Sequence, residues 1–237
     1  ALEGADCIVH LAGILIEDNN TSYASANVDA TKAVVEAAQK LGAKHIVFIS
    51  VVGASKNSSN AYFRSKGLAE EFVKNSGLAA SIIRTPILLG PNTAGASSMI
   101  GAAKQTKTKI LGGGKYSMRP LDIDDLNQAI LNCCNSDSLE AKLYELVGPE
   151  PISYRDLIQK TAAMMNNSVE IGSVPVAIAK LVSAISSRIK GGGITPTVID
   201  VITMDEVVNK NADGELNITL TPLQNTLEKI LEHKKNK

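Results

Sequence analysis

The chain has 237 residues, of which 44% are hydrophobic and only 3% aromatic, and its 24 basic residues balance its 24 acidic ones. This composition is typical of a globular chain with one domain or slightly more. It argues against a nucleic-acid partner, because no basic patch is interleaved with aromatic side chains. The apolar run at residues 7–16 contains His10 and follows no basic segment, so it predicts neither a signal peptide nor a membrane span.

The three cysteines predict neither a metal site nor a disulfide framework. Cys133 and Cys134 are adjacent, Cys7 lies in a predicted strand, and the sequence has no Cys-x-x-Cys motif. Free thiols of this kind fit a reducing compartment, so we expect a cytoplasmic protein without a bound metal.

The first predicted element is a buried parallel strand at residues 7–11, within which His10 is expected to be packed and hydrogen-bonded. Ala12 and Gly13 follow it, and their small size lets the backbone approach a ligand. A long helix is predicted over residues 22–41. Asn27 in this helix is either an ordinary polar residue or a functional one.

The next stretch carries the candidate chemistry. A buried strand at residues 45–49 stops at Ser50, a polar loop follows, and a helix begins at Ala61. Tyr62 and Lys66 are four residues apart and therefore lie on one face of that helix. An ammonium beside a phenol favours the phenolate, so Lys66 is expected to lower the pKa of Tyr62 from about 10 and suit it to proton exchange.

A Tyr–Lys pair at this spacing also arises by chance in roughly one such sequence in three. Its context favours function, because a second apolar strand at residues 80–84 follows and leads into Thr85 and Pro86. The pair would then lie at the carboxyl ends of two parallel strands.

The later elements are predicted from the same patterns. We expect a helix at residues 97–106 beside the substrate cleft, carboxylates at 122–125 capping the helix 126–133, a strand at 143–147, and Ser153 capping the helix 154–165. Glycines 112–114 and 191–193 lack the spacing of a dinucleotide-binding turn and are expected in loops. The amphipathic helix at 174–190 predicts core packing or a subunit contact, with peripheral membrane contact as the alternative.

The Tyr–Lys helix between two strands resembles the extended and atypical short-chain dehydrogenase/reductases. Further motifs of that family are recognisable at residues 6–13, 27–31, 36–38 and 119–125. Residues 48–50, 53–54, 61–66 and 148–150 resemble bacterial relatives of the NAD(P)H-binding accessory subunit of respiratory complex I. The resemblance implies an α/β fold with a partial doubly wound, Rossmann-like parallel sheet over residues 1–147. Residues 148–237 would form a smaller, mostly helical lobe on the substrate side.

The resemblance also implies NAD(P) as cofactor, with NADP(H) favoured, and an oxidoreductase or epimerase/dehydratase reaction on a small molecule or a quinone. Tyr62 would act as general acid/base and Lys66 would hold the nicotinamide ribose. The family's active-site serine falls at or just after Ser50, but the next residue is Val51, which cannot polarise a carbonyl. Either Ser50 or Ser55 in the loop therefore completes the catalytic set, or catalysis is impaired. The implied cofactor-binding residues are Ala12, Gly13, Asn27, Lys66, Thr85 and Pro86. The alternative is a non-catalytic NAD(P)H-binding scaffold or assembly factor.

In the family, strands upstream of the one that residues 7–11 resemble supply the glycine-rich turn for the cofactor pyrophosphate. The sequence that begins at Ala1 does not contain this turn. We therefore expect part of a longer fold whose strand at 7–11 is an exposed edge, and which by itself binds NAD(P) poorly and self-associates.

Overall fold

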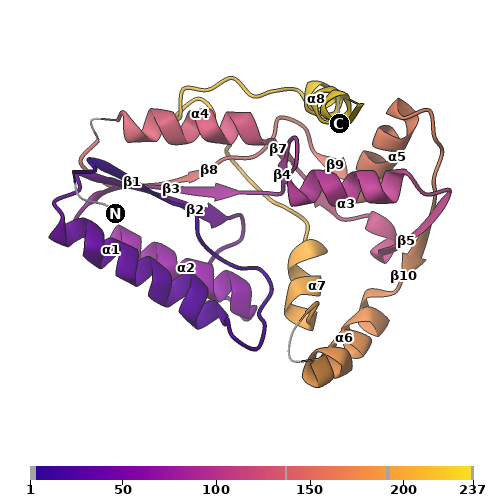
Figure 1. Ribbon diagram of the computed structural model, residues 1–237, viewed down its shortest axis with the longest axis horizontal. Coiled ribbons are helices and arrows are strands. Elements are labelled where there is room, and N and C mark those ends of the chain that lie inside the picture. The colour runs from indigo at the N-terminus through magenta and orange to yellow at the C-terminus, as the bar shows by residue number, and fades with distance from the viewer. Residues whose placement is uncertain (1–3, 137, 191–192, 236–237) are drawn as a thin grey trace.

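The computed structural model describes residues 4–136, 138–190 and 193–235. Its centre is a sheet of four strands in the order β1-β2-β3-β8, and every neighbouring pair is parallel (Figure 1). The strands are β1 (Cys7–His10), β2 (His45–Val51), β3 (Ala79–Thr85) and β8 (Ala141–Glu145). The predicted strands are present, and their ends differ from the predicted ones by one or two residues.

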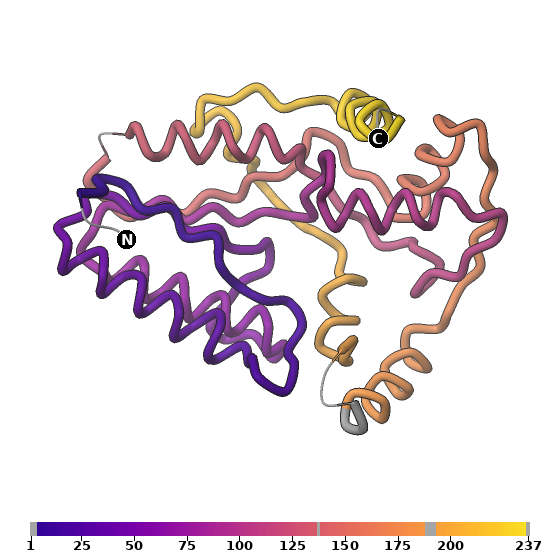
Figure 2. The backbone as a smooth tube through the Cα atoms, in the orientation of Figure 1, coloured from indigo at the N-terminus to yellow at the C-terminus, as the bar shows by residue number. Residues whose placement is uncertain are grey.

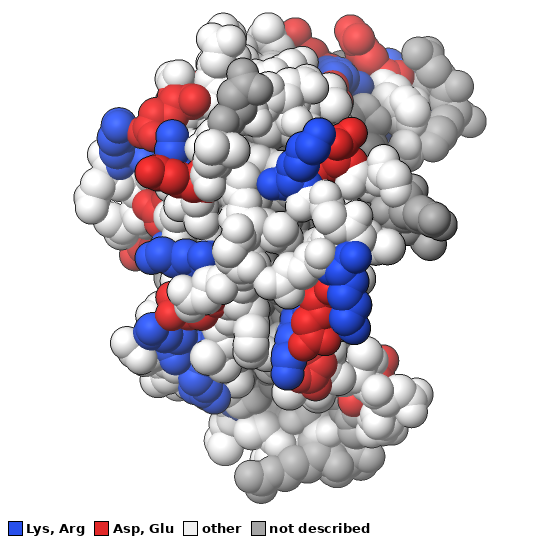
Figure 3. Space-filling view, turned by 90° about the vertical axis from the view of Figure 1, so that its left-hand side faces the viewer, with Lys and Arg blue, Asp and Glu red and all other residues white. Residues whose placement is uncertain are grey.

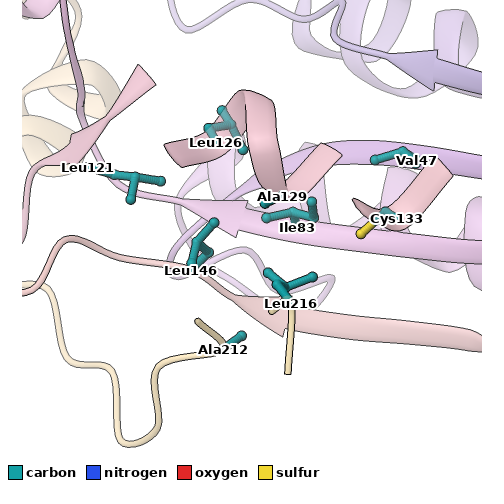
Figure 4. Packing of buried hydrophobic residues seen from close by; sticks show 9 residues of the cluster. All are labelled: Val47, Ile83, Leu121, Leu126, Ala129, Cys133, Leu146, Ala212 and Leu216. Atoms are coloured by element: carbon teal, nitrogen blue, oxygen red, sulfur yellow. The ribbon is translucent and has the colours of Figure 1, made fainter. Parts of the chain in front are cut away.

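Helices cover both faces of this sheet, which confirms the doubly wound, Rossmann-like α/β architecture (Figure 1). On one face α1 (Ala30–Lys40) and α2 (Ala61–Lys74) pack over Ile46 and Phe48. On the other face α4 (Ile123–Cys134) packs over Val47 and Ile83. Side chains alternate between the faces of a strand, so both faces of β2 must be apolar to be buried. Figure 4 shows the second of these cores.

β1 lies at the edge of the described sheet and has one hydrogen-bonded neighbour, β2. Within the predicted run, Val9 is 38% and Leu11 is 66% exposed. The expected edge position is therefore found in the described sheet, and the expected burial holds for Ile8 but not for Val9 and Leu11. Its His10 is buried and bonded to Thr31, as expected.

A second group of elements packs beyond the carboxyl ends of the strands (Figure 1). Its core lies between α3 (Ala94–Ala103) and α5 (Tyr154–Met164). Two parallel strands, β5 (Lys107–Leu111) and β10 (Glu170–Val174), border it, and neither was predicted from the sequence. The remaining elements are η1 (Ala24–Asp29), β4 (Leu88–Leu89), η2 (Gly112–Gly114), β6 (Ser117–Met118), β7 (Leu121–Asp122), β9 (Ile152–Ser153), α6 (Val176–Lys190), α7 (Pro196–Ile202) and α8 (Leu223–Lys235). The division at residue 147 stays a prediction.

The predicted loops and caps are mostly present. Ser153 caps α5 by accepting a hydrogen bond from the Asp156 backbone N–H. Glycines 112–114 form a short 3₁₀ turn in which all three have positive φ. Of the second glycine cluster, residues 191–192 lie outside the described residues.

The amphipathic helix α6 lies apart from the sheet, beside α7 (Figure 2). Ile178, Leu181, Val182 and Ile185 on its apolar side are 57–65% exposed. The expectation that this side packs into the core is therefore wrong, because α6 touches the rest of the described chain mainly through α7. Its apolar face is left open to solvent.

The surface at the α1 end of the sheet carries basic and acidic side chains in close alternation (Figure 3). Solvent-exposed ion pairs of the described chain include Lys32–Glu36, Lys44–Asp6 and Lys56–Glu71. In the described part of the chain, no helix combines the length and apolarity needed to cross a bilayer.

Asp122 joins α4 to the C-terminal helix α8. Its carboxylate accepts a hydrogen bond from the Asp124 backbone N–H and so caps α4, as expected. The same fully buried carboxylate accepts bonds from Thr226 Oγ1 at 2.7 Å and from Lys229 Nζ at 2.6 Å. The Asp122 side chain therefore both caps the start of α4 and binds two residues of α8.

We predict that Asp122→Ala lowers the free energy of unfolding by about 2 kcal/mol, because it removes a helix cap and leaves Lys229 without its buried partner. Asp124→Ala is the matched control. Asp124 contacts the same lysine through a side chain that is 68% exposed, so its loss should cost less than about 0.5 kcal/mol. Urea denaturation of both variants measures the difference, and equal losses would contradict this account of α4 and α8.

Candidate cofactor and substrate site

α2 begins close to the ends of β2 and β3 and carries the Tyr–Lys pair. Asn60 caps the helix by accepting hydrogen bonds from the backbone N–H groups of Tyr62 and Phe63. At Gly67 the helix packs directly on the loop that follows β2, where a Cβ atom would lie only 2.3 Å from backbone atoms of Ser55 and Lys56. Glycine is therefore required for this close approach.

Lys66 is 6% exposed and extends under the end of β2. Its Nζ donates a hydrogen bond to the Ile49 carbonyl at 2.8 Å and lies 4.4 Å from the centre of the Phe48 ring. Burial lowers the pKa of Lys66 to about 8, and the nearby charge of Glu70 opposes this shift only in part.

Burial raises the pKa of Tyr62 to about 12. The expectation that Lys66 lowers the pKa of this phenol is therefore wrong for the structure, because the ammonium is held by a backbone carbonyl and the loss of solvation is the dominant effect. Tyr62 packs beside Tyr23, with 5.8 Å between ring centres. At neutral pH Tyr62 is a phenol that can donate a proton.

Asn27 is buried because it lies in the π-helical segment η1, which turns its side chain inward. Its Oδ1 accepts a hydrogen bond from the Ile14 backbone N–H at 2.8 Å. Its Nδ2 donates to the Ile14 carbonyl and to Ser65 Oγ. Asn27 therefore fixes the loop after β1 against α2, and of the two roles left open by the sequence the structure favours a positioning one.

Ser50 is buried at the end of β2, and its hydroxyl is bonded to a carboxylate of α2. It donates a 2.5 Å hydrogen bond to Glu70 Oε1, and Glu70 also forms a 2.7 Å ion pair with Arg84. Val51 and Val52 follow Ser50 and line the space beside Tyr62. The Ser50 hydroxyl is thus engaged by Glu70, and the two residues that follow it carry no hydroxyl.

A cavity of about 270 Å³ lies where the loop after β1 meets the ends of β2 and β3. Six of the residues singled out from the sequence line it, namely Gly13, Ser50, Tyr62, Lys66, Thr85 and Pro86. Asn27 is not among the described lining residues, but it is hydrogen-bonded to Ile14, which is. Ala12 is exposed in the same loop and is not among the described lining residues either. Residues distant in the sequence are thus brought to one place.

The residues of this cavity fit the nicotinamide-ribose end of NAD(P). At Gly13 a Cβ atom would lie 3.0 Å from Asn27 Oδ1 and 3.6 Å from Lys66 Nζ, so only glycine leaves the space open. Lys66 and Tyr62 offer hydrogen-bond donors to ribose hydroxyls, and Pro86 offers an apolar wall to a flat ring.

A second cavity of about 360 Å³ lies on the other side of Tyr62 and shares Leu15, Val51, Tyr62 and Pro86 with the first. Its wall is mainly apolar, with side chains that include Val52, Phe63, Ile87, Met118, Val201 and Met204. Glu206 is the one charged residue among the described lining residues, and burial raises its pKa. This cavity therefore suits a neutral, largely apolar compound.

Most of the residues that line this second cavity were not predicted from the sequence. Tyr116 and Tyr154 stack with ring centres 5.8 Å apart, and Glu206 accepts a hydrogen bond from the Arg119 backbone N–H. These residues come from separate parts of the chain and carry no shared motif. The sequence feature that could have indicated an apolar cavity wall was the high density of apolar residues after residue 174.

We predict that Lys66 gives the protein a distinct pH dependence. Folding lowers the pKa of the Lys66 ammonium from its ordinary value of 10.5 to about 8. Between these two pH values the unfolded chain therefore binds more protons than the folded protein, and the free energy of unfolding rises with pH. Relative to Lys66→Met, the wild type should gain about 2 kcal/mol between pH 7 and pH 10. Urea denaturation measures this, with Lys74→Met at the exposed end of α2 as the control. A constant difference between wild type and Lys66→Met would contradict the low pKa of Lys66.

Comparisons with known proteins agree with the Rossmann-like fold. Residues 1–112 match the family model described as NAD(P)H-binding. NADH dehydrogenase (ubiquinone) 1 alpha subcomplex subunit 9 of Arabidopsis thaliana, a mitochondrial protein, is 27% identical over 231 residues, covering 92% of this chain and 57% of that protein. Photosystem II assembly factor Ycf39 of Synechocystis sp. is 23% identical over 185 residues, covering 75% of this chain and 53% of that protein. The chain thus spans little more than half the length of these relatives.

Among solved structures, MoeE5 in complex with UDP-glucose and NAD has the same fold, with a TM-score of 0.74 and 15% sequence identity. The match covers 99% of this chain and 81% of that one. The resemblance predicted from the sequence is therefore confirmed: residues 1–112 match the NAD(P)H-binding family model, the fold is Rossmann-like, and the chain has homologues among the subunits of respiratory complex I.

Proposed function

We propose that this chain carries the nicotinamide end and the substrate side of an NAD(P)-dependent oxidoreductase that reduces a neutral, largely apolar carbonyl compound. The observation that supports this most is the position of Tyr62, which lines both cavities. A proton donor between a cofactor cavity and a substrate cavity is what carbonyl reduction requires.

In this proposal the phenol of Tyr62 donates its proton to the substrate carbonyl oxygen, and the pKa of about 12 keeps the phenol protonated at neutral pH. NAD(P)H, when bound, supplies the hydride that goes to the carbonyl carbon. Lys66 holds the ribose, while Asn27 and Tyr23 hold the loop at Ile14 and Leu15 that forms the cavity wall. Ser50 acts as a positioning residue through Glu70.

The chemistry of the second cavity supports the choice of substrate. No basic side chain is among its described lining residues, and its carboxyl group, Glu206, would repel a diphosphate. A quinone or an apolar aldehyde or ketone suits this wall better than a nucleotide sugar does. NADP(H) remains our first choice of cofactor, and the free thiols lead us to place the protein in the cytoplasm.

A second candidate function is a non-catalytic NAD(P)H-binding scaffold or assembly factor. It is favoured by Val51 and Val52, which stand beside Tyr62 where a second hydroxyl would polarise a carbonyl, and by the bond that ties the Ser50 hydroxyl to Glu70. A relative with an assembly-factor name also supports it. NADPH oxidation by the gene's full-length product, tested with short-chain quinones, apolar aldehydes and UDP-glucose, separates the two functions. Tight NADPH binding without turnover of any of them would favour the scaffold.

We predict that Tyr62→Phe lowers the reduction rate by about a hundred- to ten-thousandfold and leaves NAD(P)H affinity nearly unchanged, because the phenol supplies only the proton. Tyr144→Phe, which changes a tyrosine outside both cavities, should keep the wild-type rate. Initial rates and fluorescence titration with NAD(P)H measure the two effects. More than about a tenth of the rate remaining in Tyr62→Phe would exclude Tyr62 as the proton donor.

We also propose that the exposed apolar face of α6 rests on an anionic membrane surface. Residues 176–190 contain Lys180, Arg188 and Lys190 and no acidic residue, which suits anionic lipid headgroups, although Lys180 also pairs with Asp200 of α7. We predict that the protein cosediments with vesicles of phosphatidylglycerol and phosphatidylcholine, and that Leu181→Glu reduces this at least tenfold. Binding that is equal for both proteins, or absent for the wild type, would contradict the membrane contact, and a concentration-dependent dimer would point to a subunit contact instead.

A further inference from the structure

Two cysteine side chains that are far apart in the sequence meet between the sheet and α4. Cys7 is the first residue of β1 and Cys134 is the last residue of α4, and their Sγ atoms lie 2.9 Å apart. A disulfide requires about 2 Å between sulfurs, so the two atoms need to approach by roughly 1 Å. Both residues are at the ends of their elements, where a small backbone shift disturbs few hydrogen bonds.

The surroundings of the pair give the two thiols different roles. The S–H group of Cys7 donates a hydrogen bond to Cys134 Sγ, so Cys134 is the acceptor of the pair. Burial and this contact raise the pKa of the Cys7 thiol to about 12. Cys7 and Cys134 are partly exposed, whereas the neighbouring Cys133 is 3% exposed in the core of Figure 4. A small oxidant can therefore reach the pair but not Cys133.

We propose that Cys7 and Cys134 form a reversible intrachain disulfide by exchange with a small disulfide such as oxidised glutathione. The Cys134 thiolate attacks one sulfur of glutathione disulfide, which breaks the S–S bond, releases one glutathione thiolate and leaves a mixed disulfide. Cys7 loses its proton to solvent and attacks the Cys134 sulfur, which releases the second glutathione. Two protein thiols are oxidised and one glutathione disulfide is reduced to two glutathione molecules.

This bond would fasten the edge strand of the described sheet. β1 is hydrogen-bonded to β2 alone in the described sheet, and the loop that follows β1 carries Gly13 and Leu15 into the cofactor-side cavity. Linking Cys7 to the end of α4 ties this strand to a second element and closes a long loop of the unfolded chain. Oxidation should therefore stabilise β1 and hold the cofactor loop more firmly.

The test oxidises the full-length protein with glutathione disulfide, blocks free thiols with iodoacetamide, and identifies cross-linked tryptic peptides by mass spectrometry. Cys7 lies in the peptide that ends at Lys32, and Cys134 lies in the peptide 116–142, since cleavage after Arg119 is blocked by Pro120. That second peptide also contains Cys133, so the experiment is repeated with Cys133→Ser. We expect the cross-link in both proteins, together with a melting temperature about 5 °C higher that dithiothreitol reverses.

Cys7→Ser and Cys134→Ser should each lose the cross-link and the oxidation-dependent shift in melting temperature, while their reduced forms melt close to the reduced wild type. The proposal is overturned if oxidation yields only glutathione adducts or disulfide-linked dimers. It is also overturned if Cys133→Ser removes the cross-link, or if the cross-link forms without any change in melting temperature.

Discussion

A buried ion pair between β3 and α2 is the constraint on which the rest of the site depends. Arg84 donates from Nε and Nη2 to the two carboxylate oxygens of Glu70 at 2.9 and 2.7 Å, and from Nη1 to Glu145 in β8 at 3.3 Å. Ser50 in β2 donates to the same Glu70 carboxylate. Three strands and one helix are thus joined through side chains that water hardly reaches.

Such a pair adds little net stability, because desolvation offsets most of the attraction, but the loss of either partner would leave an unpaired buried charge. Its effect is on orientation. Glu70, Lys66 and Tyr62 follow one another at intervals of four and lie along one face of α2, so fixing Glu70 beneath the sheet turns Tyr62 toward the cavities. The same carboxylate also engages the hydroxyl of Ser50, which lines the cavity. This explains why the geometry suits proton donation by Tyr62 and yet also accommodates a protein that binds NAD(P)H without turnover.

The part of the structure that could be predicted from the sequence is the part specified by local patterns. Apolar runs, caps and the spacing of Tyr62 and Lys66 identified the strands and α2, because neighbours in sequence determine them. The pKa of Tyr62 could not be predicted, since it depends on burial by distant segments and on the carbonyl that holds Lys66. The exposure of α6 was missed because an apolar stripe shows which face prefers burial and not whether the fold provides a cover. The Cys7–Cys134 contact depends on tertiary structure alone.

The central claim is that Tyr62 separates a nicotinamide site from a substrate site. A crystal structure of the full-length protein with NADPH bound tests it most directly. The account predicts the nicotinamide ring between Pro86 and Tyr62, the ribose hydroxyls within hydrogen-bond distance of Lys66, and the face of the ring that carries the hydride turned toward the cavity of Val52, Phe63 and Met204. A nicotinamide ring bound outside these residues, or turned away from that cavity, would contradict it.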